Sequence, residues 1–289
     1  MKNKLENKQL EVITDSFGAE MHSIRHDGIE YLWQADPEFW ARHAPILFPI
    51  VGKLTNDEYY YDSKSYKMEG HGFARDSEFK LISTSTDEII YELTDSANSL
   101  EKYPFHFNLK ITYKLVENRI TVNYAVRNTD KKTIYFGIGA HPAFNVPLEQ
   151  GSFEDYYLSI DPTEKRAHIP IDPATGTLKL SEAEDVSDYK KKLTHELFSS
   201  DALVYTSSDK MTVSLENNLD DRSVSVSWEK MPFFGLWSPY PKKAPFVCIE
   251  PWCGVADIQT IDADLTIKFG INTLEPDQVF ECSYVIEVS

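Results

Sequence analysis

The sequence predicts an all-β fold of packed antiparallel sheets with a few short helices. Three observations lead to this prediction: apolar and polar residues alternate with period two in several runs, turn signals separate these runs, and helical patterns are scarce. Such alternation is typical of strands that bury one face and expose the other.

The clearest run covers residues 105–115, where apolar and polar side chains alternate without interruption. A turn signal at residues 117–118 follows, and residues 120–126 alternate again, so the two runs predict a β-hairpin. Asp27–Gly28 lies between two further strand-like runs and predicts another tight turn. The same alternation predicts three more strands, at residues 224–228, 265–269 and 280–288.

Helical signals occur at two places. Asp36–Pro37 is a typical start of a short helical turn that would run to Trp40. Ser181 and Glu184 fit a capping box, which predicts a short helix that ends near Ser199. Both would decorate a β protein.

The composition indicates a folded protein with a large core, because 42% of the residues are hydrophobic. We find no internal repeat and no low-complexity linker, so we expect a single domain over residues 1–289; the length leaves two domains as the alternative. The 29 Lys and Arg against 46 Asp and Glu give a net charge of −17. This charge opposes binding to nucleic acid and to anionic membranes, so we expect neither as a partner.

The chain has no apolar run long enough to cross a membrane. Its basic first residues precede no apolar stretch, so we expect no secretory signal peptide and a cytoplasmic location. The cysteines, Cys248, Cys253 and Cys282, form no CxxC pair. They therefore predict neither a disulfide framework nor structural zinc.

Four segments interrupt the alternation and concentrate candidate functional residues. Residues 42–53 contain two prolines and begin with Arg42, whose guanidinium suits hydroxyls or a phosphate. Residues 70–75 place His71 between two glycines, which leaves room for a ligand against the backbone. The alternative interpretations are a surface arginine and an ordinary turn histidine.

The other two segments follow strand-like runs. His141 lies among small residues just before a proline and is either a site residue or a core histidine. Glu250 follows four apolar residues, and a carboxylate in such a place is costly unless it is paired or functional. Trp237 and Trp252 offer flat surfaces for sugar rings, or are core tryptophans.

Together these segments resemble the aldose 1-epimerase (galactose mutarotase-like) superfamily, in particular a bacterial branch found with lactose and galactose utilisation genes. The resemblance covers almost the whole chain from about Leu10, and rests on Arg42 with its Pro-rich segment, His71–Arg75, Gly139–Pro142 and Glu250–Pro251. It implies a galactose mutarotase-like β-supersandwich. It also implies an isomerase that interconverts the α and β anomers of a free hexose such as galactose or glucose, without cofactor or metal.

By this resemblance His141 matches the general acid of the family and Glu250 its general base. His71 matches a second histidine, which helps to hold the ring-oxygen side of the sugar. Mutarotation needs one base for the C1 hydroxyl proton and one acid for the ring oxygen, which we expect on opposite sides of the anomeric carbon.

Arg42 and Arg75 match positions that bind substrate hydroxyls, or a phosphate in the hexose-6-phosphate branch. That branch has two glycines after the arginine, where this chain has His43–Ala44, a departure that counts against a sugar phosphate. Asp201 resembles an acidic residue that binds sugar hydroxyls, and Trp237 completes the predicted binding set.

Other functions remain open at the level of the sequence. A hexose-6-phosphate mutarotase and a noncatalytic carbohydrate-binding protein would use the same residues. A glycosidase needs a second carboxyl group beside Glu250, for which Asp201 is the candidate. A metal enzyme would use His71, His141 and Glu250 as two-histidine, one-carboxylate ligands. The expected assembly is a monomer or a homodimer.

Overall fold

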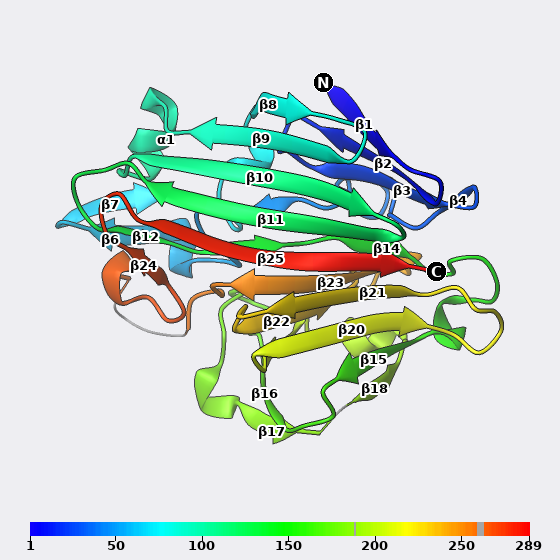
Figure 1. Cartoon of the computed structure of the whole chain (residues 1–289). Helices are drawn as coiled ribbons and strands as arrows, with labels where there is room; N and C mark the ends of the chain where they lie inside the picture. Colours follow the sequence, from blue (N-terminus) through cyan, green and yellow to red (C-terminus); the bar gives the residue numbers. More distant parts are fainter. Residues whose placement is uncertain (188, 259–262) are drawn as a thin grey trace.

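The structure is a computed structural model that describes residues 1–187, 189–258 and 263–289. Two large antiparallel sheets dominate it (Figure 1). The nine-stranded sheet has the order β18 (Lys190–Lys192), β15 (Tyr157–Asp161), β20 (Lys210–Glu216), β21 (Val224–Glu229), β25 (Val279–Val288), β11 (Arg119–Asn128), β10 (Phe107–Val116), β9 (Glu88–Thr94) and β8 (Lys80–Thr84). The fold-class prediction, an all-β sandwich, is confirmed.

The eight-stranded sheet packs against the nine-stranded one and carries the candidate site. Its order is β17 (Glu184–Val186), β16 (Arg166–Ile169), β19 (Leu203–Thr206), β22 (Phe233–Trp237), β23 (Phe246–Cys253), β13 (Ile138–Ala140) and β5 (Ile46–Leu47), with β14 (Ala143–Asn145) also paired to β23. A four-stranded sheet of β1 (Lys2–Glu6), β2 (Leu10–Asp15), β3 (Met21–His26) and β4 (Ile29–Glu30) lies beside them.

The remaining elements are short. Two ribbons pair β6 (Glu58–Tyr61) with β7 (Lys64–Lys67) and β12 (Ile134–Phe136) with β24 (Asn272–Leu274). The helices are α1 (Ala97–Lys102) and the 3₁₀ turns η1 (Thr55–Asp57), η2 (Ala74–Asp76), η3 (Phe153–Asp155), η4 (Leu180–Glu182), η5 (His195–Phe198) and η6 (Leu265–Ile267). No helix in the described part of the chain has the length and apolarity needed to cross a membrane.

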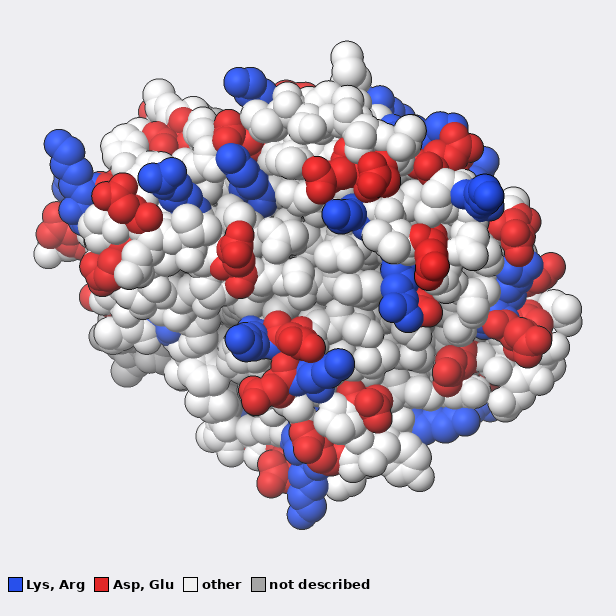
Figure 2. Space-filling model, in the orientation of Figure 1, with Lys and Arg blue, Asp and Glu red and all other residues white. Residues whose placement is uncertain are grey.

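The predicted hairpin at residues 105–126 is confirmed as β10 and β11, which pair along their whole length. On β10 every second side chain, from Phe107 to Leu115, is buried against the core. The outward side chains from Asn108 to Lys114 are polar, and Arg119 of β11 pairs with Glu287 of β25 at 2.9 Å. Figure 2 shows both signs of charge interspersed over this face, so the excess acidity is not a uniform field here.

The strands predicted at residues 224–228 and 280–288 are confirmed as β21 and β25, and Asp27–Gly28 forms the turn between β3 and β4. The strand predicted at residues 265–269 is wrong: Leu265–Ile267 is a 3₁₀ turn, η6. The carboxylate of Asp264 accepts the Thr266 backbone N–H and caps that turn. The alternation misled because Lys268, read there as polar and outward, is buried and ion-paired.

The helix predicted from the capping box at Ser181 is also wrong. In the described part of that range the chain forms the edge strands β17 and β18 and then η5, whose first turn is capped by the hydroxyl of Thr194. Pairing with β16 and β15 satisfies the backbone there, and this tertiary pairing overrides the local helical signal. At residues 36–40 the chain makes a single turn, closed by the Trp40 N–H on the Asp36 carbonyl at 2.9 Å, and no helix.

Candidate functional site

The strand register brings His141 and Glu250 together. Gly139 pairs with Trp252 and Ala143 pairs with Cys248 on the neighbouring strand β23, so the same register places His141 opposite Glu250. His141 follows β13, and Pro142 interrupts the ladder before β14. Residues 109 positions apart in the sequence therefore become cross-strand neighbours.

All eight residues of β23 are buried, and alternation divides them between two environments. Val247 and Ile249 pack in the main core between the sheets. Cys248, Glu250 and Trp252 face the other way, because side chains two positions apart share one face of a strand. A strand buried on both faces reads as one apolar run in the sequence, and Glu250 interrupts this run.

The imidazole of His141 and the carboxylate of Glu250 make close contact in a nearly dry environment. Nε2 of His141 lies 3.2 Å from Oε2 of Glu250, and the two residues are 8% and 1% exposed. Within the described part of the chain, neither Nδ1 of His141 nor Oε2 of Glu250 has a hydrogen-bond partner of good geometry. The contacting pair therefore carries two buried polar atoms, one on each residue, that the described part of the protein does not satisfy.

Burial dominates the electrostatics of this pair. It lowers the pKa of His141 well below 6.5, helped by His71 and Arg75, and it raises the pKa of Glu250 well above 4.5, helped by Asp201. Both shifts favour the uncharged forms. The same pair with its proton on the imidazole would be a carboxylate beside an imidazolium, the form in which one group can take a proton and the other can give one.

Aromatic rings surround the pair. The ring of His141 stacks on Trp40 with centroids 4.8 Å apart and meets Trp237 edge-on at 5.6 Å. Trp252 lies against the neighbouring strands, where a Cβ on Gly139 or Gly235 would come within 2.5 Å of its indole ring. The absence of a side chain at both positions therefore leaves the space that the Trp252 indole occupies.

His71 belongs to the loop after β7 and has a positive φ of 67°. Its Nδ1 accepts the backbone N–H of Gly52 at 3.2 Å, so the proton of the neutral ring is on Nε2. Burial and the nearby Arg75 and Arg42 lower the pKa of His71 to about 3. His71 is thus a neutral imidazole that presents an N–H, with its ring 5.5 Å from that of His141.

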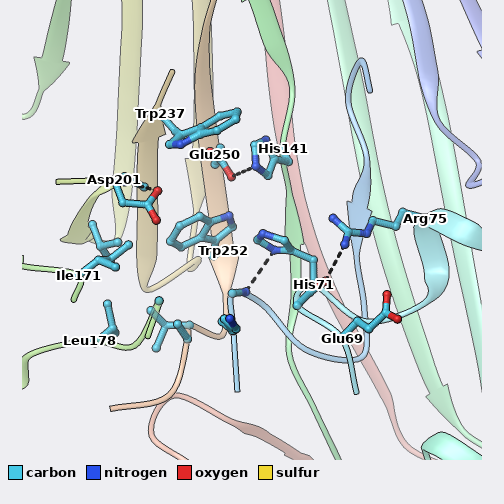
Figure 3. Close-up of a pocket in the computed structure, with 18 of the residues that line it drawn as sticks. Glu69, His71, Arg75, His141, Ile171, Leu178, Asp201, Trp237, Glu250 and Trp252 are labelled. Carbon is cyan, nitrogen blue, oxygen red and sulfur yellow. Dashed lines mark hydrogen bonds and ion pairs between the residues drawn. The ribbon is translucent and has the colours of Figure 1, made fainter. Parts of the chain in front are cut away.

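These residues line one cavity of about 520 Å³, in which His71 and Arg75 lie on one side and Asp201 on the other (Figure 3). Arg75 donates to the carbonyl of Gly70 at 2.7 Å. The cavity brings together six of the seven predicted site residues: His141, Glu250, His71, Arg75, Asp201 and Trp237. Arg42 is not among the lining residues described; its guanidinium pairs with Asp76 at 2.9 Å.

Several lining residues were not predicted from the sequence. Trp40 is predicted only as the end of a helical turn, Lys53 ends the Pro-rich segment 42–53 without a predicted role, and Asp57 and Glu69 carry no motif. Trp252 is a candidate platform for a sugar ring, but the predicted binding set does not include it. An aromatic residue just before Arg42 is the one local signal that points to Trp40.

A metal ion has two possible donor sets among the described residues. One is His141, Cys248 and Glu250, whose donor atoms lie within 4.8 Å of one another, and the other is Glu20, His22 and His43. The set expected for a metal enzyme, His71 with His141 and Glu250, is not one of them. Cys248 is fully buried, and its pKa is raised well above 9 by burial and by Glu250.

The fold and the site define a β-sandwich protein with an open, aromatic-lined cavity over a buried imidazole–carboxylate pair. The profile of the aldose 1-epimerase family matches residues 1–286. The chain belongs to this family.

Known relatives agree with this membership. The protein LacX, plasmid, of Lactococcus lactis subsp. lactis is 35% identical over 263 residues, which are 88% of each chain. A galactose mutarotase related enzyme from Lactobacillus acidophilus has a TM-score of 0.98 at 37% identity, covering 100% of this chain and 97% of that one. A galactose mutarotase-like protein from Lactobacillus casei ATCC 334 has a TM-score of 0.94 at 32% identity, with 100% of both chains covered.

Proposed function

We propose that the protein is a mutarotase that interconverts the α and β anomers of a free hexose by general acid–base ring opening. The observation that carries this proposal is the contact of 3.2 Å between His141 and Glu250 at the floor of the cavity. Family membership supports it independently. The reaction needs one group that gives a proton and one that takes a proton, and this pair supplies both.

The position of the pair suits the chemistry. The hydroxyl oxygen and the ring oxygen of a hexose are bound to the same anomeric carbon, so two adjacent side chains can serve both oxygens. This differs from the expected placement on opposite sides of the sugar, because the register of β13 and β23 puts both groups on one face. The resemblance assigns the acid role to His141 and the base role to Glu250.

The proton balance closes over one cycle. The base takes the proton of the C1 hydroxyl while the acid protonates the ring oxygen, and the bond between C1 and the ring oxygen breaks. The aldehyde then rotates about the C1–C2 bond. Ring closure on the other face returns the proton to the acid, and the base gives its proton back to the new C1 hydroxyl. The low exposure of the pair keeps water away during these transfers.

The other cavity residues would bind and orient the sugar. Nε2–H of His71 and the guanidinium of Arg75 are donors for ring and hydroxyl oxygens, and Asp201 is an acceptor. Trp237 and Trp40 offer aromatic surface for the faces of the ring. We propose that Arg42 supports sugar binding indirectly from its ion pair with Asp76, since it is not among the lining residues of the cavity.

The charges favour a neutral hexose over a hexose 6-phosphate. Two cations, Lys53 and Arg75, line the cavity, against the carboxylates of Asp57, Glu69 and Asp201. A phosphate dianion would enter a cavity in which anionic side chains outnumber cationic ones.

The main apolar core contains buried residues from Leu5 to Val288, and this supports the further proposal that one domain spans the chain.

The test is NMR of a freshly dissolved pure anomer of galactose or glucose. We expect the protein to accelerate equilibration, and His141→Ala and Glu250→Ala each to reduce kcat by about 10²- to 10⁴-fold while thermal unfolding stays cooperative. A protein that binds the sugar without accelerating exchange would be a carbohydrate-binding protein. Full activity in either variant would contradict the assignment.

A further inference from the structure

A second cluster of histidines and a carboxylate lies outside the cavity. His22 lies at the start of β3, Glu20 directly precedes that strand, and His43 lies in the segment that leads to β5. The rings of His22 and His43 are stacked, with centroids 4.1 Å apart and an interplanar angle of 13°. Glu20 lies within reach of both rings, so three potential donors from two separate segments converge.

The carboxylate is anchored. Oε1 of Glu20 accepts the backbone N–H groups of His43 and Ala44 at 2.7 and 2.9 Å. Nδ1 of His43 lies 3.8 Å from Oε1, and Nε2 of His22 lies 3.8 Å from Oε2. These ring–carboxylate separations are too long for hydrogen bonds.

The ring nitrogens are otherwise unused. Within the ranges that the structure describes, no ring nitrogen of His22 or His43 takes part in a hydrogen bond, although the two side chains are only 18% and 19% exposed. An imidazole with its ordinary pKa of about 6.5 is mostly neutral at pH 7. Neutral imidazole is the form that binds a metal ion.

We propose that Glu20, His22 and His43 bind one divalent transition-metal ion of the Zn²⁺ type. Two donor atoms bound to one tetrahedral ion at about 2.0–2.2 Å lie about 3.3–3.6 Å apart. The ring–carboxylate separations of 3.8 Å are slightly longer, and the donor atoms of all three residues lie within 4.8 Å of one another. Because the lone pairs lie in the ring planes, one of the two stacked rings would turn to bind the ion. Two imidazoles and a carboxylate form a common donor set for such ions. The charged groups that face the three residues are the cations Lys2, Arg42 and the N-terminal ammonium and the anions Asp15 and Asp76.

The ion would have a structural effect next to the proposed catalytic site. The carbonyl of His43 accepts the backbone N–H of Ala143, two residues after His141. A metal ion held by β3 and by His43 would fix the segment that carries Arg42 against this strand. The inference does not depend on the proposed mutarotase activity, and it departs from the expectation that no metal is bound.

The experiment is titration of the full chain, freed of metal by chelation, with Zn²⁺ in a calorimeter and with Co²⁺ in an absorbance spectrometer. We expect one Zn²⁺ per chain, a higher Tm when it is bound, and an affinity that falls at least about 10-fold in His22→Gln and in His43→Gln. His106→Gln is the matched control, because His106 is an exposed histidine elsewhere on the molecule and should leave binding unchanged.

Co²⁺ separates this cluster from the cavity. Binding at Glu20, His22 and His43 gives nitrogen and oxygen ligation, whereas binding at His141, Cys248 and Glu250 adds a thiolate charge-transfer band that Cys248→Ala removes. The proposal is overturned if no saturable binding occurs, if the thiolate band accompanies the single bound ion, or if both histidine variants bind as the wild type does. The Co²⁺ spectrum of the wild type decides the question even if a variant fails to fold.

Discussion

Two buried carboxylates lie beside histidines in this protein, and their hydrogen bonds differ. Glu250 is 1% exposed and Glu20 is 6% exposed, and burial raises the pKa of both. Glu20 accepts two backbone N–H groups, whereas Oε2 of Glu250 has no hydrogen-bond partner in the described ranges. A carboxylate that is satisfied by the backbone holds a segment in place, and one left unsatisfied beside an imidazole is free to exchange a proton.

The largest expected effect comes from the same substitution at both carboxylates. We expect Glu250→Gln to reduce kcat for anomer exchange by about 10²- to 10⁴-fold, because an amide neither takes nor gives the proton. Glu20→Gln keeps an oxygen for the two N–H groups, so we expect kcat within a few-fold of wild type and about 1 kcal/mol less stability. Anomer-exchange NMR and urea unfolding of both variants measure the two effects.

The proposed difference in role between Glu250 and Glu20 is contradicted if the two variants behave alike. A large loss of kcat in Glu20→Gln with normal stability would mean that Glu20 takes part in the chemistry. A normal kcat in Glu250→Gln would mean that the unsatisfied carboxylate is not the proton carrier.

A smaller effect concerns how the free energy of unfolding decreases as the pH is lowered. The pKa of His43 in the folded state is about 4, against 6.5 ordinarily, so as pH falls the unfolded chain takes up this proton first. The stability that this histidine contributes is fully present above pH 6.5 and is lost as pH falls toward 4, by about 3 kcal/mol at most. Urea unfolding at pH 7 and pH 5, with a chelator present, should show a shallower loss in His43→Gln than in wild type. An equally steep loss in the variant would show that His43 does not titrate on unfolding.

The smallest effect separates the two arginines. Arg75 lines the cavity, and Arg42 pairs with Asp76 beside the Glu20 cluster. We expect Arg75→Lys to raise KM about 10-fold, because one fork-shaped donor to the sugar is lost, and Arg42→Lys to raise it less than about 3-fold. Steady-state kinetics with both variants provides the measurement; a larger effect for Arg42 would place it in direct contact with the sugar.

Local patterns predicted the elements whose pairing is also local. The hairpin of β10 and β11 was predicted because consecutive strands with strict alternation leave one arrangement that buries their apolar faces. The predictions failed at residues 265–269 and 181–199. There a buried Lys268 and the pairing of the edge strands β17 and β18, both set by distant segments, override the local signal.

The sequence by itself determined the all-β class and the chemical character of most site residues. Glu250 could be recognised as a candidate because burying a carboxylate within an apolar run costs free energy unless the group is paired or functional. The sequence did not determine that His141 lies opposite Glu250, that Arg42 lies outside the cavity, or that Trp40 belongs to its wall. These depend on strand register and on packing between segments far apart in the chain. Periodicity reports which face of a strand is buried, and only the tertiary structure decides which neighbour that face meets.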